Sequence, residues 1–114
     1  MAEVRKLICK SKSRTLGEIV GVIKADLCSE FVCEANMLGG KAVLLCFEDY
    51  YFRCNSYVSL SIMITETDDC QEVVIAGFGG GQGLLNISYG ANKSFASKAV
   101  KCLTKIGFSE TIYE

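Results

Sequence analysis

The chain has 114 residues, with 12 lysine and arginine residues against 13 aspartate and glutamate residues, so its formal net charge is −1. This length predicts a single domain over residues 1–114, and the near-neutral charge excludes bulk attraction to nucleic acid or to an anionic membrane surface. The chain has no histidine, which removes the most common general base and the most common metal ligand. We therefore expect no nucleic-acid partner, no metal and no cofactor.

The cysteines and the N-terminal residues predict the cellular compartment of the protein. Seven cysteines are spread along the chain without the close C-x-x-C pair that zinc sites ordinarily use. Residues 1–10 do not have the shape of a signal peptide, and no segment is long and apolar enough to cross a membrane. These features predict a cytoplasmic protein with free thiols and no membrane partner.

The first third of the chain predicts a strand followed by a helix. Residues 3–10 alternate loosely between polar and apolar side chains, as in a β-strand. Residues 16–29 carry an apolar stripe at spacings of three and four residues, and the T-x-x-E pattern at residues 15–18 fits a capping box. Gly17 and Gly21 lower the helix propensity, and we interpret them as spacing that allows close packing against a sheet.

The remaining residues predict five strands and a second helix. Residues 57–65 alternate most cleanly, with Val58, Leu60, Ile62 and Ile64 on one face, as in a half-buried antiparallel strand. The expected strands cover residues 31–37, 41–53, 57–65, 72–78 and 84–89, the expected helix covers residues 93–106, and the tail at 108–114 is expected to fray or to join a sheet edge.

These elements predict an α+β fold in two layers, with the order β-α-β-β-β-β-β-α. Consecutive strands joined by short turns pair antiparallel, and both helices have a single apolar stripe. We therefore expect an antiparallel sheet of five to six strands with the two helices on one face. The other face would carry Ser59, Ser61, Met63 and part of residues 47–53, and it must meet water, a ligand or a second subunit.

The most unusual segment is the glycine-rich loop at residues 77–83. Such loops can hold phosphate, because bare backbone N–H groups approach the anion closely and a following helix adds positive potential. Here the loop is expected to join two strands, and no P-loop lysine follows it. We favour a wide turn whose glycines supply positive φ, with an anion-binding or ligand-binding loop as the alternative.

Residues 48–53 combine carboxylates with tyrosines. Neighbouring residues of a strand point to opposite faces, so Glu48 and Asp49 cannot flank one substrate as an acid/base pair unless a bulge intervenes. Tyr50 and Tyr51 could line a pocket or fill an interface. The lysines of the second helix are interpreted as a solvated outer face: Lys98, Lys101 and Lys105.

Three sequence motifs point to a family. They are FEDYY at residues 47–51, NSYVSLSI at 55–62, and GGGQG at 79–83 followed by Gly90 before the last helix. Together they resemble a family of small bacterial proteins classified only as a domain of unknown function, most clearly in the Val-Ser-Leu strand and the Gly-Gly-x-Gln loop. Members commonly have a serine where this chain has Gly81. The resemblance implies a bacterial origin and assigns no activity, cofactor or catalytic residue.

Two hypotheses about function follow, and neither is an enzyme. We favour a non-enzymatic module that forms a homodimer or binds a protein partner through the open sheet face. The alternative is a small-molecule or anion-binding domain. The glycine-rich loop with Gln82 would form the rim of its binding site, and Tyr50 or Tyr51 would form the wall. An enzyme is disfavoured because nothing marks an activated nucleophile or base. The candidate ligand-binding residues are Gly79, Gly80, Gly81, Gln82, Gly83, Tyr50 and Tyr51.

Overall fold

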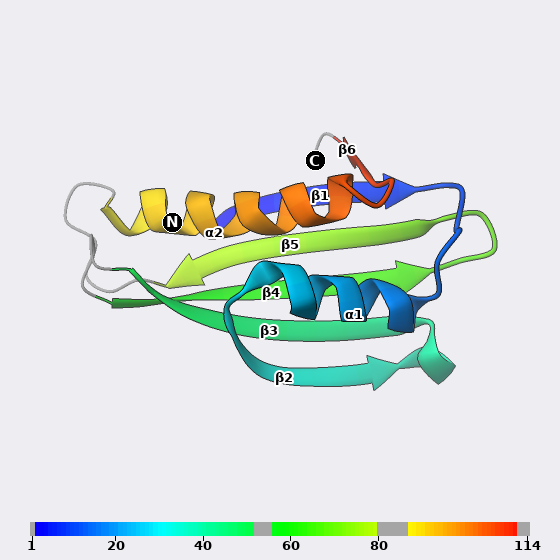
Figure 1. The fold of residues 1–114 in the computed structure, drawn as a ribbon, viewed down its shortest axis with the longest axis horizontal. Helices are drawn as coiled ribbons and strands as arrows, with labels where there is room; N and C mark the ends of the chain where they lie inside the picture. Colours follow the sequence, from blue (N-terminus) through cyan, green and yellow to red (C-terminus); the bar gives the residue numbers. More distant parts are fainter. Residues whose placement is uncertain (1, 52–55, 80–86, 112–114) are drawn as a thin grey trace.

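The computed structural model describes residues 2–51, 56–79 and 87–111 (Figure 1). These residues form six strands, two α-helices and one short 3₁₀ helix. In chain order the elements are β1 (Glu3–Cys9), α1 (Leu16–Leu27), β2 (Glu30–Met37), the 3₁₀ helix η1 (Leu38–Gly40), β3 (Ala42–Tyr51), β4 (Ser56–Glu66), β5 (Gln71–Gly79), α2 (Ile87–Thr104) and β6 (Ser109–Thr111).

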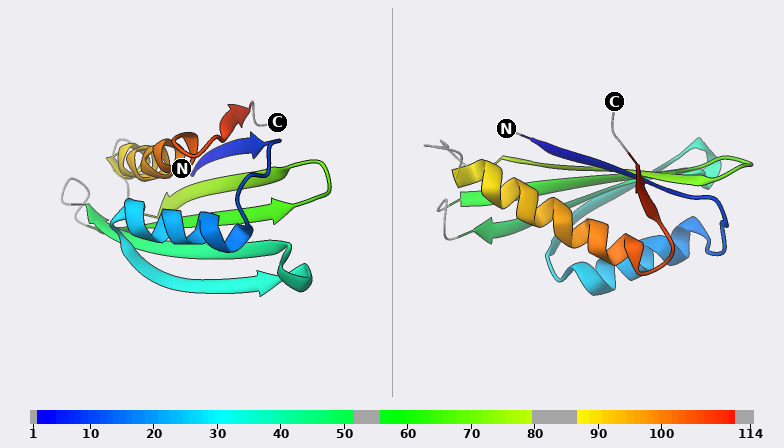
Figure 2. Two further views of the ribbon diagram at one scale, coloured as in Figure 1. Left: turned by 45° about the vertical axis from the view of Figure 1, so that its right-hand side comes forward. Right: turned by 90° about the horizontal axis from the view of Figure 1, so that it is seen from above.

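The six strands form one sheet in the order β2-β3-β4-β5-β1-β6, and neighbouring strands pair antiparallel. Both helices lie on the same face of this sheet, which is clearest when the molecule is seen from above (Figure 2). The predicted two-layer α+β fold with the helices on one face is therefore confirmed. The opposite face of the sheet carries no helix of the described residues.

The sixth strand differs from the predicted one. Residues 87–89, which were expected to be part of a strand at 84–89, form the start of α2, and residues 84–86 lie outside the described residues. The sixth strand is instead β6, so the tail joins a sheet edge. The reason lies in the spacing of apolar residues: Ile87, Ala91, Phe95 and Ala99 recur every four residues, which extends the stripe of the helix beyond the predicted start at residue 93.

The start of α1 is fixed by the predicted capping box. The Thr15 hydroxyl accepts a hydrogen bond from the Glu18 backbone N–H at 3.1 Å, and the Glu18 carboxylate accepts one from the Thr15 N–H at 2.8 Å. These two bonds satisfy backbone donors that the first turn of a helix leaves free. The apolar stripe of α1 is buried against the sheet through Ile19, Val20, Ile23 and Leu27.

Gly17 and Gly21 do not mediate close packing, so that interpretation is wrong. A Cβ atom at Gly21 would have no atom within 4 Å, and one at Gly17 would meet only the Thr15 hydroxyl, at 3.9 Å. Both glycines lie on the solvent side of α1. The missing side chains therefore face water and do not bring the helix closer to the sheet.

Gly21→Ala is therefore expected to stabilise the protein by about 0.5–1 kcal/mol, because alanine has the higher helix propensity and loses less backbone entropy on folding. The measurement is the free energy of unfolding in urea. The matched reverse change, Ala25→Gly in the same exposed helix, is expected to destabilise by a similar amount. A loss of stability in Gly21→Ala would show that this position contacts another part of the molecule.

The core lies between the sheet and the helices. Side chains from the centre of the sheet meet the apolar faces of α1 and α2, and the largest are completely or almost completely buried: Leu7, Ile19, Ile23, Leu45, Phe47, Leu60, Ile62, Ile64, Ile75, Phe95 and Leu103. At one point the sheet and α2 come unusually close. A Cβ atom at Gly77 would lie 2.7 Å from the backbone oxygen of Asn92, closer than real Cβ contacts.

The two edges of the sheet differ in length and in exposure. Every residue of β2 is exposed, over eight positions. The other edge, β6, has three residues and is held by the guanidinium of Arg5, which donates hydrogen bonds to the carboxylate of Glu110. This bond to Arg5 lowers the pKa of Glu110. The edge at β2 therefore presents the longer row of backbone groups to another chain.

Candidate functional site

Within the described residues, no helix covers the face of the sheet opposite α1 and α2 (Figure 2). Val43, Leu45 and Phe47 point into the core, so the residues between them point the other way. We define the open face as the even-numbered residues 4–8 of β1, 44–50 of β3 and 72–78 of β5, together with the odd-numbered residues 57–65 of β4.

The centre of the open face is apolar. The pairing of the strands places Leu44, Met63 and Val74 side by side across β3, β4 and β5. The next row consists of small side chains, with Ser61 between Cys46 and Ala76. The face therefore has a raised apolar row beside a lower row, a relief that a complementary surface could fit.

Aromatic side chains project from the end of the open face near Gly79. Tyr50 and Tyr57 are paired across β3 and β4, with ring centroids 5.3 Å apart and the rings nearly perpendicular. Tyr57 is 56% exposed, and Phe78 on β5 is 42% exposed. Tyrosine and phenylalanine are enriched in protein–protein interfaces relative to the rest of the protein surface.

The charged side chains of the open face lie on its outer two strands, β1 and β3, where Lys6 is opposite Val74, and at one end of β5. They are Lys6, Glu48 and Glu72. The ammonium of Lys6 lies 3.6 Å from the carboxylate of Glu72, so these two side chains form an ion pair. An apolar centre with charges at the rim is the arrangement typical of a protein–protein interface.

The two tyrosines of the predicted site lie on opposite faces of β3. Tyr50 is on the open face, whereas Tyr51 packs beneath α2, with its ring centroid 6.2 Å from that of Phe95. The ammonium of Lys98 lies 5.7 Å from the Tyr51 ring and 3.4 Å from the Asp49 carboxylate. The structure thus separates Tyr50 from Tyr51, and Lys98 has a partner in β3 as well as exposure to water.

The glycine-rich loop has a different context from the predicted one. β5 ends at Gly79 and α2 begins at Ile87, so the segment leads from a strand to a helix and not from strand to strand. Gly79 pairs with Val58 and has a φ of 96°, as predicted for a glycine that supplies positive φ. Gly80, Gly81, Gln82 and Gly83 lie outside the described residues, so their role in binding a ligand stays a prediction.

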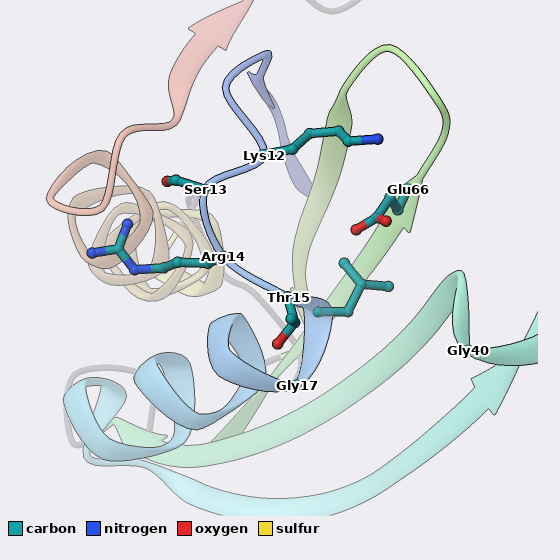
Figure 3. A pocket seen from close by; sticks show the side chains of 8 residues that line it. Lys12, Ser13, Arg14, Thr15, Gly17, Gly40 and Glu66 are labelled. Atoms are coloured by element: carbon teal, nitrogen blue, oxygen red, sulfur yellow. The ribbon is translucent and has the colours of Figure 1, made fainter.

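A pocket of about 380 Å³ lies at the N-terminal end of α1 (Figure 3). Its charged neighbours are already engaged by the protein. The Lys12 ammonium donates to the backbone oxygens of Thr67 and Asp68 at 2.7 and 3.0 Å, and the Arg14 guanidinium points away and donates to the Ile106 oxygen at 3.0 Å.

Glu66 completes the charged lining of this pocket. Its carboxylate accepts a hydrogen bond from the amide of Gln71 at 2.9 Å, and the same amide donates to the backbone oxygen of Arg14 at 2.7 Å. Gln71 is buried, so these bonds tie the loop before α1 to the start of β5. The pocket is therefore a junction between loops rather than a set of side chains free to act on a substrate.

A sequence model of a family of unknown function, DUF6054, matches residues 6–107 of the chain. The chain belongs to this family. The match includes both helices and all of β2 to β5, so every residue of the open face except Val4 lies within the matched DUF6054 region. The predicted resemblance to a family of unknown function is confirmed. No curated protein and no solved structure gives a significant match.

In this DUF6054 chain the cysteines of the described ranges are free and differ in environment. Cys9 and Cys102 are buried, and burial raises the pKa of Cys102 to about 11. Among the residues placed in the structure, no group of three or more cysteine, aspartate, glutamate or histidine side chains is arranged to hold a metal ion. No helix in the described ranges is both long enough and apolar enough to span a bilayer.

Sequence reasoning missed one pair of residues on the open side of the sheet. Cys33 on the exposed strand β2 lies directly opposite Cys46 on β3. The two are 13 positions apart in the sequence, and a local irregularity in β2 sets their alignment. Their spacing in the sequence therefore does not reveal that they face each other.

Proposed function

We propose that the protein is a non-enzymatic interaction module that self-associates through the open face. The observation that carries the proposal is the row formed by Leu44, Met63 and Val74, an apolar centre in a sheet whose other face alone is covered by helices. An antiparallel sheet with one solvated face normally carries polar side chains there. In this chain the charged side chains of that face lie on its outer two strands and at one end of β5.

The size of the open face favours a second copy of this chain as its binding partner. The four strands of the open face, at about 4.8 Å spacing and about 17–30 Å long, outline about 450 Å². Projecting side chains increase the accessible area beyond this outline, toward the roughly 800 Å² per partner of a standard interface. A two-fold axis would bring the same face of both copies together, giving an isologous dimer with helices on its two outer sides.

The relief of the face also suits such packing. Ser59 and Ser61 leave low positions along β4, whereas Met63 and Tyr57 on the same strand project and are 37% and 56% exposed. Two sheets pack about 10 Å apart when large side chains of one fit beside small ones of the other. Met63 would then lie near the middle of the interface, because it is flanked by Leu44 and Val74.

Met63→Glu tests this proposal. Light scattering coupled to size-exclusion chromatography is expected to show a dimer for the wild-type chain and a monomer for the variant. The carboxylate would be buried without a partner against its own symmetry mate, and we expect affinity to fall at least about 100-fold, which corresponds to about 2.7 kcal/mol. Circular dichroism and thermal unfolding check that the variant remains folded.

Leu38→Glu is the matched control. Leu38 is 75% exposed in η1, outside the open face, so the same charge is expected to leave the dimer intact. A dimer that is lost in Leu38→Glu but kept in Met63→Glu would place the interface on the β2 edge instead. A wild-type chain that stays monomeric at high concentration contradicts self-association.

We also propose a cytoplasmic setting for this module. Support comes from the free thiols of the described ranges, several of which are accessible to solvent. In an oxidising compartment exposed cysteines are ordinarily paired.

A further inference from the structure

Two cysteines of neighbouring strands are aligned by a β-bulge. In the pairing of β2 with β3, Phe31 lies opposite Phe47 and Cys33 lies opposite Cys46, so Val32 is the additional residue. Without this bulge Val32 would occupy the position opposite Cys46, and the Cys33 side chain would point to the helix side of the sheet. A bulge of this kind directs a side chain to a chosen face.

The two cysteines face each other across neighbouring strands, and at least one of them is accessible. The pairing of β2 with β3 puts Cys33 directly opposite Cys46, and hydrogen bonding with the Cys46 side chain raises the pKa of Cys33. Cys33 is exposed and Cys46 is half-buried, with its sulfur 3.9 Å from the Ser61 hydroxyl. A small reagent in solution can therefore reach Cys33 first and Cys46 through it.

The strand geometry permits a bond between them. Directly opposite residues of an antiparallel pair have Cβ atoms about 4.5–5.5 Å apart, and a disulfide needs about 3.8 Å. The difference requires β2 to move slightly toward β3. As an edge strand β2 is paired on one side only and every residue is exposed, so no second strand resists this movement.

We propose that Cys33 and Cys46 form a reversible cross-strand disulfide, a redox modification site on the open side of the sheet. The oxidant is a low-molecular-weight disulfide. The Cys33 thiolate attacks one of its sulfurs and releases one thiol, and the Cys46 thiolate then attacks the mixed disulfide and releases the second. Two protein thiols lose two electrons and two protons, and the small disulfide is reduced to two thiols. Such a bond requires strand movement, so a reducing environment should reopen it readily.

Other cysteines in the described ranges lack this arrangement. Cys28 ends α1, Cys70 lies in the turn before β5, and Cys9 and Cys102 are buried. The Cys9 sulfur contacts the Ser11 hydroxyl at 3.2 Å, and no cysteine is paired with it across the sheet. Cys33 and Cys46 are the facing pair within the strands described here.

Peptide mapping of the full chain tests the proposal. The protein is incubated with oxidised and reduced glutathione over a series of ratios, free thiols are alkylated, and the chain is digested without reductant by trypsin and a glutamate-specific protease. Cleavage after Glu30, Glu34, Lys41 and Glu48 separates Cys33 from Cys28. The expected predominant cross-link joins peptide 31–34 to peptide 42–48, and the protein is expected to migrate as a monomer on a non-reducing denaturing gel.

Variants sharpen the result. Cys33→Ser, at an exposed position that should tolerate it, is expected to abolish the cross-link, and the matched control Cys28→Ser is expected to retain it. Glutathione on Cys33 with Cys46 still alkylated would overturn the proposal, as would a predominant link from Cys46 to any other cysteine. Because the bond lies within one chain, a link found only between two chains would also overturn it. Cys46 belongs to the open face, so the mapping is repeated with Met63→Glu, in which no second copy is expected to cover that face.

Discussion

Gly77→Ala is expected to lower the free energy of unfolding by about 2 kcal/mol, because the added Cβ would lie 2.7 Å from the backbone oxygen of Asn92. The atom that blocks it belongs to the backbone of α2, so no side-chain rotation can relieve the contact. The helix must instead move away from β5 and lose packing at Phe95 and Ala96, both completely buried. The small gain from replacing glycine within a strand does not offset this loss.

Urea unfolding of two single variants, Gly77→Ala and Gly90→Ala, checks this expectation. Gly90 belongs to α2 itself, and a Cβ at that position has no atom within 4 Å. The identical chemical change is therefore expected to be neutral or slightly stabilising there, through helix propensity. Equal effects at both positions would show that α2 does not depend on close approach to β5.

Much of the fold could be predicted from local patterns in the sequence. The alternation of residues 57–65, the stripe of residues 16–29 and the T-x-x-E motif each involve neighbours in the chain, and each corresponds to an observed element. The start of α2 was harder, because residues 84–89 alternate briefly like a strand although Ile87 also begins the four-residue spacing of a helix. A short alternation and a helical stripe can coincide over three residues, and the tertiary contacts of α2 decide between them.

The candidate site shows the same limit more sharply. Alternation alone places Ser59, Ser61 and Met63 on a face away from the helices, and it also separates Tyr50 from Tyr51. It does not reveal that Gly77 is needed for the approach of α2, because that contact depends on a helix far along the chain. The cysteine pair was equally hidden, since the bulge at Val32 changes which residues of β2 face which side.

Phe47→Ala is expected to destabilise the protein by about 3–5 kcal/mol, which is the largest effect among these variants. Phe47 is 1% exposed and belongs to the core cluster between β3 and the helices. Removing its ring eliminates apolar burial and leaves a cavity that the surrounding strands cannot fill completely. Urea unfolding measures the effect, and a loss below about 1.5 kcal/mol would mean that the core collapses around the gap.

Phe31→Ala is the matched control, because Phe31 and Phe47 form one aromatic pair with centroids 5.7 Å apart. Either substitution removes this edge-to-face contact, worth about 0.5–1.5 kcal/mol, but Phe31 is 42% exposed and leaves no closed cavity. Phe31→Ala also removes the cation–π contact with the Lys24 ammonium, which lies 4.3 Å from the ring centroid. The free energy of unfolding is therefore expected to fall by about 1–2 kcal/mol in total. A cost equal to that of Phe47→Ala would show that β2 is part of the core. A smaller cost means that β2 is held mainly by its backbone pairing with β3, and such a strand is free to make the small movement that the Cys33–Cys46 bond requires.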